Sequence, residues 1–251
     1  MPQKEWFATW FDSPYYHLLY QHRDDNEARL FLQELVQKIK LPKGASVLDL
    51  ACGKGRHALT LAQMGYKVLG VDLAPTSIAA AKSQAAQLGI QELDFAVHDM
   101  RLRMETPPFD AVFNLFTSFG YFDTLAENQA VCSSISQMLL PGGLLVIDFL
   151  NAHKVCAQLK ATETLEREGV IFDIKRWHND THIYKQIEVI LGQNHTPVGV
   201  FTERVQALSL TDFESLLAAD FEIIETFGSY HLTPFELNSS ERLILIAKKK
   251  A

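Results

Sequence analysis

Two carboxylates and two glycines stand where the chain passes twice from an apolar run into a turn. Asp49 lies near the end of the apolar run 46–51, Asp72 lies near the end of the next run, and Gly53 and Gly55 fall between them. Glycines at such a turn let the backbone bend sharply and approach a ligand without an obstructing Cβ. An acid about 20 residues past the turn can bind both hydroxyls of a ribose. The stretch predicts a nucleotide site. An alternative role for Asp49 is to orient the turn through bonds to backbone N–H groups.

The turn alone does not decide the class of nucleotide. The spacing Gly53-x-Gly55-x-x-Ala58 fits the dinucleotide fingerprint. That fingerprint does not require the acid that Asp49 supplies four residues before the first glycine. The helices and strands around the turn are therefore needed to choose between a dinucleotide and another nucleotide.

Strands and helices alternate at the short spacing of a parallel, doubly wound sheet. Apolar runs predict strands at 46–51, 67–73, 92–97, 109–116 and 144–150, with helices at 56–65, 75–89 and 127–140. A short connection indicates that two final strands, 221–228 and 242–250, pair antiparallel. The expected fold class is α/β, with a doubly wound seven-stranded mixed sheet, its last strand antiparallel, and a small antiparallel β insertion.

Four segments organise the chain. They are an aromatic arm and helix at 1–40, the nucleotide-binding core at 41–150, an antiparallel insertion at 151–208, and a helix and strand pair at 209–251 that complete the core. Alternating apolar and polar residues predict three strands in the insertion, at 170–177, 182–190 and 198–208. The last helix, 211–219, is expected to begin with a capping box of Thr211 and Glu214.

Composition narrows the classes of partner. The 251 residues carry a formal net charge of −7, which suits a phosphate backbone poorly, so no nucleic-acid partner is expected. Three cysteines without a CxxC pair favour a reducing compartment. The start has no signal-peptide pattern and no apolar run approaches the length of a membrane span, so the expected place is the cytoplasm, with no membrane partner.

Taken together, the motifs resemble those of class I S-adenosylmethionine (SAM) dependent methyltransferases of the small-molecule type, with an antiparallel lid inserted after strand five. The segments that carry the resemblance are VLDLACGKGRHA, VLGVDLA, HDMR, FDAVFNLFTSFGYF, LLPGGLLVIDF and FGSYHLTPFELNSSERLILIAKK. The resemblance covers most of the chain. It implies SAM as the cofactor and methyl transfer to a small-molecule acceptor.

The resemblance also implies a set of cofactor-binding residues. They are Tyr16, Tyr20, Arg23, Asp49, Ala51, Gly53, Gly55, Asp72, Leu73, Asp99, Met100, Asn114, Leu115 and Phe116. In this set Asp72 takes the ribose hydroxyls, Asp99 accepts from the adenine amino group, and Arg23 pairs with the cofactor carboxylate. The arm is expected to close over SAM, and the insertion to roof the acceptor pocket.

The acceptor side has no motif that names a substrate. Candidate acceptor contacts are Tyr121, His153, His178, Tyr230 and His231, and no general base is assigned. The nine histidines lack metal-ligand spacing, so no metal is expected. Whether oxygen, nitrogen or carbon is methylated stays open, as does the oligomeric state.

Three other functions remain as alternatives. The first is an NAD-dependent oxidoreductase with the same turn, and the second is a catalytically silent SAM-binding module. The third, methylation of a nucleic-acid base, usually resembles an N/D-P-P-Y motif after strand four. Asn114-Leu115-Phe116-Thr117 stands there instead, without a proline.

Overall fold

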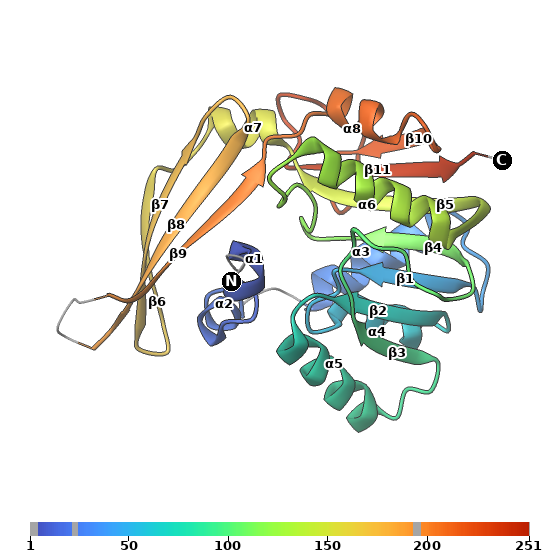
Figure 1. The fold of residues 1–251 in the computed structure, drawn as a ribbon, viewed down its shortest axis with the longest axis horizontal. Helices are drawn as coiled ribbons and strands as arrows, with labels where there is room; N and C mark the ends of the chain where they lie inside the picture. The colour runs from blue at the N-terminus through green and yellow to red at the C-terminus, as the bar shows by residue number, and fades with distance from the viewer. Residues whose placement is uncertain (1–4, 22–24, 193–196, 251) are drawn as a thin grey trace.

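A seven-stranded mixed sheet forms the centre of the computed structural model, which describes residues 5–21, 25–192 and 197–250 (Figure 1). Its strand order is β10-β11-β5-β4-β1-β2-β3. The strands are β1 (Ser46–Leu50), β2 (Lys67–Asp72), β3 (Leu93–Val97), β4 (Phe109–Asn114), β5 (Leu139–Leu150), β10 (Phe221–Phe227) and β11 (Arg242–Lys249). Strand β11 runs antiparallel to both β5 and β10, while β1 to β5 pair in parallel. The expected fold class is confirmed.

Helices cover both faces of this sheet, which is why its strands are continuous apolar runs. One face packs under α3 (Asp25–Lys38), α4 (Arg56–Gln63) and α5 (Pro75–Leu88). The other packs under α6 (Leu125–Met138) and α8 (Leu210–Leu217). Both parallel-sheet faces are therefore buried, and only the strand ends are left to form a site.

Local signals set the helix ends. Helix α5 has Pro75 in its first turn and ends at the left-handed Gly89, as the sequence predicts. The expected start of α8 is wrong: Ser209 is the N-cap, and it forms a capping box with Asp212 instead of the predicted Thr211 and Glu214. The same spacing of three occurs in both pairs, so the sequence pattern alone could not choose between them.

The insertion is a four-stranded antiparallel sheet, which we call the lid (Figure 1). Its strands are β6 (Thr162–Arg167), β7 (Val170–His178), β8 (His182–Leu191) and β9 (Pro197–Gln206), and α7 (Ala152–Ala157) precedes them. The prediction of three strands missed β6. This edge strand has no fully buried residue, so its sequence TETLER carries little apolar signal.

The aromatic arm is two short helices, α1 (Trp6–Trp10) and α2 (Pro14–Leu19), that pack on the inner face of the lid (Figure 1). Trp10 and Leu19 are each 1% exposed and share a hydrophobic cluster with Phe172 and Ile187 of the lid. The Trp10 indole donates to Glu203 of β9 at 2.7 Å. Arm and lid therefore share one core, while α3 packs on the central sheet.

Gln206, at the end of β9, ties the lid to the core. It is 5% exposed; its side-chain nitrogen donates to the Phe122 carbonyl at 3.0 Å and its side-chain oxygen accepts from Asn128 at 2.7 Å. Its backbone N–H donates to the Gly120 carbonyl at 2.8 Å. These buried bonds fix the loop after β4 against the lid.

We expect Gln206→Leu to lower the free energy of unfolding by about 1–3 kcal/mol, because it leaves the Asn128 amide and the Phe122 carbonyl buried without partners. Urea unfolding measures this. The double variant Asn128→Leu/Gln206→Leu should recover part of the loss, since both side-chain partners become apolar. A single variant with the midpoint of the parent would contradict this role.

Candidate active site

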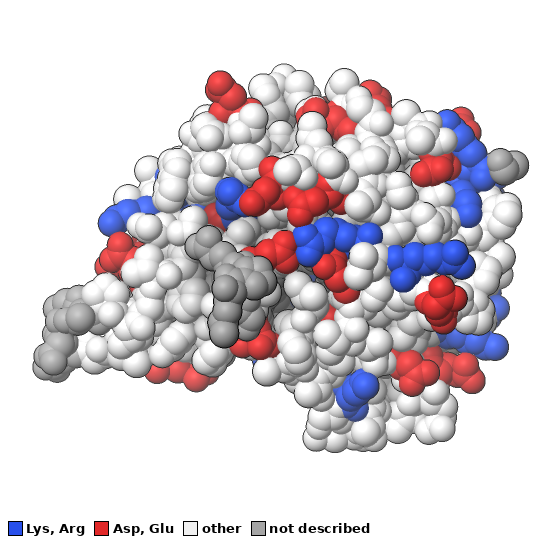
Figure 2. Space-filling view, viewed as in Figure 1, with Lys and Arg blue, Asp and Glu red and all other residues white. Residues whose placement is uncertain are grey.

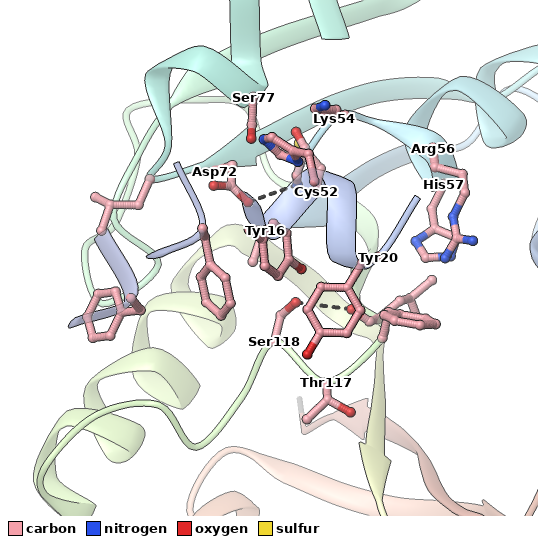
Figure 3. Close-up of a pocket in the computed structure, with 18 of the residues that line it drawn as sticks. Tyr16, Tyr20, Cys52, Lys54, Arg56, His57, Asp72, Ser77, Thr117 and Ser118 are labelled. Atoms are coloured by element: carbon pink, nitrogen blue, oxygen red, sulfur yellow. Dashed lines mark hydrogen bonds between the residues drawn. The ribbon is translucent and has the colours of Figure 1, made fainter. Parts of the chain in front are cut away.

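A cavity of about 920 Å³ opens at the carboxyl ends of the parallel strands, where α/β sheets bind ligands. Its walls come from the arm, from the central sheet and from strand β9 of the lid. Figure 3 shows Asp72 and Cys52 on one side, Thr117 and Ser118 on the other, and Tyr16 and Tyr20 between them. The site is therefore assembled from segments that are far apart in the sequence.

The glycine turn forms the floor of the cavity. Its residues Ala51, Gly53 and Gly55 all have positive φ, at 62°, 56° and 81°. A Cβ at Gly53 would meet no atom within 4 Å, whereas one at Gly55 would lie 2.6 Å from the Phe95 ring. The missing side chain of Gly53 thus leaves open space at the cavity surface, whereas that of Gly55 leaves room for the Phe95 ring.

Asp72 closes the turn at the end of β2. Its carboxylate accepts from the backbone N–H of Gly53 at 2.8 Å and from that of Ala74 at 2.9 Å. Burial raises the pKa of Asp72, and the backbone N–H groups act against that rise. The carboxylate still lines the cavity, so lone pairs remain for a ligand hydroxyl.

Asp49 lies behind the turn, 1% exposed, and does not line the cavity. Burial raises its pKa from 3.8 to about 7; the backbone N–H of Ala58 lowers it, and the nearby Asp72 raises it further. Its Oδ2 has no hydrogen-bond partner among the residues that the structure describes. The motif predicts that Asp49 contacts the cofactor directly, but its buried position behind the turn does not allow this.

Leu73, Asp99 and Met100, three of the expected cofactor-binding residues, line the cavity. Both oxygens of Asp99 already accept from Arg101, at distances of 2.6 to 3.1 Å. Burial raises the pKa of Asp99, but its bonds to Arg101 outweigh this and lower the pKa overall. An additional donor on Asp99 would share these oxygens with Arg101.

The arm supplies the cover of the cavity. The rings of Tyr16 and Tyr20 lie 4.9 Å apart, and both line the cavity. The Tyr20 hydroxyl donates to Glu203 of the lid at 2.8 Å, so the cover is attached to the lid. Arg23 lies outside the described residues.

The wall opposite the turn follows β4. Leu115, Phe116 and Tyr121 line it, but Asn114 is fully buried and its amide donates to the Leu50 carbonyl at 3.0 Å. Asn114 therefore braces β1 against β4. Several lining residues were not predicted from the sequence, namely His17, Arg56, Thr117, Ser118, Glu203, Val205 and Arg242.

Four of the five candidate acceptor contacts do not line the cavity. His153 bonds to Asn238 at 3.1 Å, and His178 is exposed at the end of β7. His231 lies 3.8 Å from Glu34 with 80% of its side chain exposed. Tyr230 is half-buried and donates to Asp148 at 3.2 Å.

Within residues 5–21, 25–192 and 197–250, no group of three His, Cys, Asp or Glu side chains is arranged to hold a metal ion. No helix in that part of the chain is both long and apolar enough to cross a membrane.

The raised pKa of Asp49 predicts a pH-dependent stability. Between about pH 4 and pH 7 the folded protein keeps a proton on Asp49 that the unfolded chain has lost. The free energy of unfolding of the ligand-free protein should therefore fall as pH rises through this range, by up to about 4 kcal/mol.

Asp49→Asn cannot ionise and should lack this fall, so its stability relative to the parent should grow from pH 5 to pH 8. Urea unfolding across this range measures the difference. Parallel stability profiles for the two proteins would show that Asp49 is ionised in the folded state.

The family model, the curated relatives and the solved structures that match this chain are methyltransferases. A family model described as a methyltransferase domain matches residues 41–188. The ubiquinone biosynthesis O-methyltransferase of Xanthomonas axonopodis pv. citri is 30% identical over 146 residues, which is 57% of this chain and 56% of that protein. The chain spans about half the length of the curated relatives it matches.

Solved structures share the whole fold. An S-adenosylmethionine-dependent methyltransferase from Clostridium acetobutylicum has a TM-score of 0.80 at 18% identity, over 94% of this chain and 96% of that one. A SAM-bound amino pentose methyltransferase from Micromonospora echinaspora has a TM-score of 0.67 at 22% identity, over 95% and 98% of the two chains. Because the family model also matches more than half of the 251 residues, this chain belongs to the methyltransferase-domain family.

Proposed function

We propose that the protein transfers a methyl group from SAM to a small-molecule acceptor. The observation that carries the proposal is the one cavity that the Gly53 turn, the Asp72 carboxylate and the loop after β4 line together. The volume of about 920 Å³ is at the upper end for small-molecule sites, which suits two ligands side by side.

Each part of the cavity has a proposed partner on the cofactor. The open space above Gly53 receives the methionine part, and Asp72 takes the ribose hydroxyls. Leu73 and Met100 pack on adenine, with Asp99 at its edge. Asp49, Gly55 and Asn114 act behind the surface by holding the turn and the strand ends.

The sulfonium is proposed to lie between the arm and the loop after β4. Tyr16, Tyr20 and Phe116 line this part, and aromatic faces stabilise positive charge. Arg23 stays a proposal for the cofactor carboxylate. Tyr121 is kept as an acceptor contact because it lines the cavity, whereas His153, His178, Tyr230 and His231 have no such support.

The transfer itself is an in-line displacement at the methyl carbon. The enzyme must align donor and acceptor at near-attack distance and exclude water. The arm and the lid exclude water, because together they cover the carboxyl edge of the sheet. Tyr20 and Glu203 bring a hydroxyl and a carboxylate to the same wall, which suits an acceptor hydroxyl or amine.

The surface charges and the free cysteines also fit a cytoplasmic enzyme that acts on a small acceptor. On the face drawn in Figure 2, basic and acidic side chains are interspersed, unlike a continuous basic track for a phosphate backbone. The three cysteines, Cys52, Cys132 and Cys156, are free thiols, as in a reducing compartment. These features support the proposal of a cytoplasmic enzyme without a nucleic-acid substrate.

Isothermal titration of the purified protein with SAM and with NADH tests the function. We expect SAM to bind with a dissociation constant at least a hundredfold below that for NADH. A library of small alcohols, phenols and amines, assayed by release of S-adenosylhomocysteine, then separates an enzyme from a silent binding module. Tight NADH binding without SAM binding would support the oxidoreductase instead.

Asp72→Asn should weaken SAM binding about ten- to a hundredfold, since a hydrogen bond to a charged group contributes roughly 1.5–3 kcal/mol. Asparagine keeps one acceptor oxygen for the turn, so the fold is expected to persist. Asp94→Asn, on the exposed side of β3, is the matched control and should bind SAM like the parent. An unchanged SAM dissociation constant for folded Asp72→Asn would remove the ribose assignment.

A further inference from the structure

Two consecutive residues just beyond β4 have unusual backbone geometry. Phe116 and Thr117 have φ angles of 70° and 60°. Left-handed backbone is uncommon for non-glycine residues, and a β-branched residue such as Thr117 is an outlier there. Such conformations persist only where the surrounding structure holds them, and they gather at functional sites. Both residues line the cavity, so the strain lies in its wall.

Asp148, on the neighbouring strand β5, is the first anchor of this wall. It is 1% exposed. Its Oδ2 accepts from the Phe116 N–H at 2.9 Å, and its backbone carbonyl accepts from the Thr117 N–H at 3.0 Å. One residue thus receives both backbone N–H groups of the strained pair.

Arg242, the first residue of β11, is the second anchor. Its Nε donates to Oδ1 of Asp148 at 2.8 Å, and its Nη2 donates to Oγ1 of Thr117 at 2.9 Å. A guanidinium holds its donors in a fixed fork, so Arg242 sets the carboxylate and the hydroxyl relative to each other. The Tyr230 hydroxyl also donates to Asp148, and the Tyr121 hydroxyl donates to the Thr117 carbonyl.

We propose that Asp148 and Arg242 are positioning residues for methyl transfer, which hold Phe116 and Thr117 in the left-handed conformation and so shape the wall that meets the acceptor. This inference rests on the proposed function. Among the described residues, the side chains of Asp148 and Arg242 bond to each other, to the loop after β4 and to Tyr230, away from the Gly53 turn. The proposed SAM contacts at Gly53 and Asp72 are left in place, so the effect of the pair falls mainly on the transfer step.

A direct role for Arg242 is the competing explanation, because its side chain also lines the cavity. A guanidinium that bound an anionic acceptor would set the acceptor KM, and lysine could partly replace it. A positioning guanidinium must reach Asp148 and Thr117 together, which the single ammonium of lysine does not reproduce. The two explanations thus predict different kinetic changes.

The test compares Arg242→Met and Arg242→Lys with the parent and with Arg167→Met, a control on the lid whose guanidinium donates to the Glu166 carbonyl. SAM affinity is measured by titration, kcat and acceptor KM with an acceptor from the library, and backbone φ in ligand-free crystals. We expect both Arg242 variants to bind SAM within threefold of the parent and to lose at least tenfold in kcat. Phe116 and Thr117 should leave positive φ in Arg242→Met, and Arg167→Met should match the parent.

Retention of positive φ at both residues in Arg242→Met would overturn the inference, as would an unchanged kcat with a raised acceptor KM. If the Arg242 variants do not fold, Thr117→Val keeps the shape and removes the hydroxyl, and a several-fold lower kcat is expected; an unchanged kcat overturns the inference. If the parent fails to bind SAM, the proposed function fails, but the φ angles still decide whether the pair holds the wall.

Discussion

The hydrogen bond from the Gly53 backbone N–H to the Asp72 carboxylate is the constraint on which the site depends. It joins the turn after β1 to the end of β2, and it fixes the turn with its open side toward the cavity. The parallel sheet supplies the two strand ends, and the helices on its faces bury everything else. Only the carboxyl edge is therefore left to bind ligands.

The second constraint is that arm and lid are one packing unit. Trp10 and Leu19 are buried against Phe172 and Ile187, and Glu203 accepts from both the Trp10 indole and the Tyr20 hydroxyl. The arm, proposed to cover the cofactor, and the lid, proposed to roof the acceptor, are therefore coupled through one core. Removal of the arm would also expose the core of the lid, so deletions cannot assign separate roles to the two segments.

Much of the central fold was predictable because its signals are local. Buried parallel strands are apolar runs, Pro75 and Gly89 mark a helix, and Gly53 and Asp72 have the spacing of a nucleotide turn. The edge strand β6 was not predictable, because its residues are only partly buried. The start of α8 was ambiguous because two capping pairs have the same spacing.

The proposed acceptor wall could not be predicted, because it forms only when segments far apart in the sequence come together in the fold. Thr117, Glu203 and Arg242 come from three separate segments, and none has a local pattern that marks it. The chemistry of histidine favours it as an acceptor contact wherever it occurs, yet His153 and His231 lie on the exposed surface. The strained Phe116–Thr117 backbone is invisible in the sequence, since nothing in these residue types predicts positive φ.

A crystal structure of the protein with S-adenosylhomocysteine tests the central claim most directly. The account predicts both ribose hydroxyls within about 3 Å of the Asp72 carboxylate. It also predicts the amino-acid part of the ligand above Gly53, and the sulfur facing Phe116 and Thr117. A ribose bound elsewhere, or a ligand outside this cavity, would contradict the account.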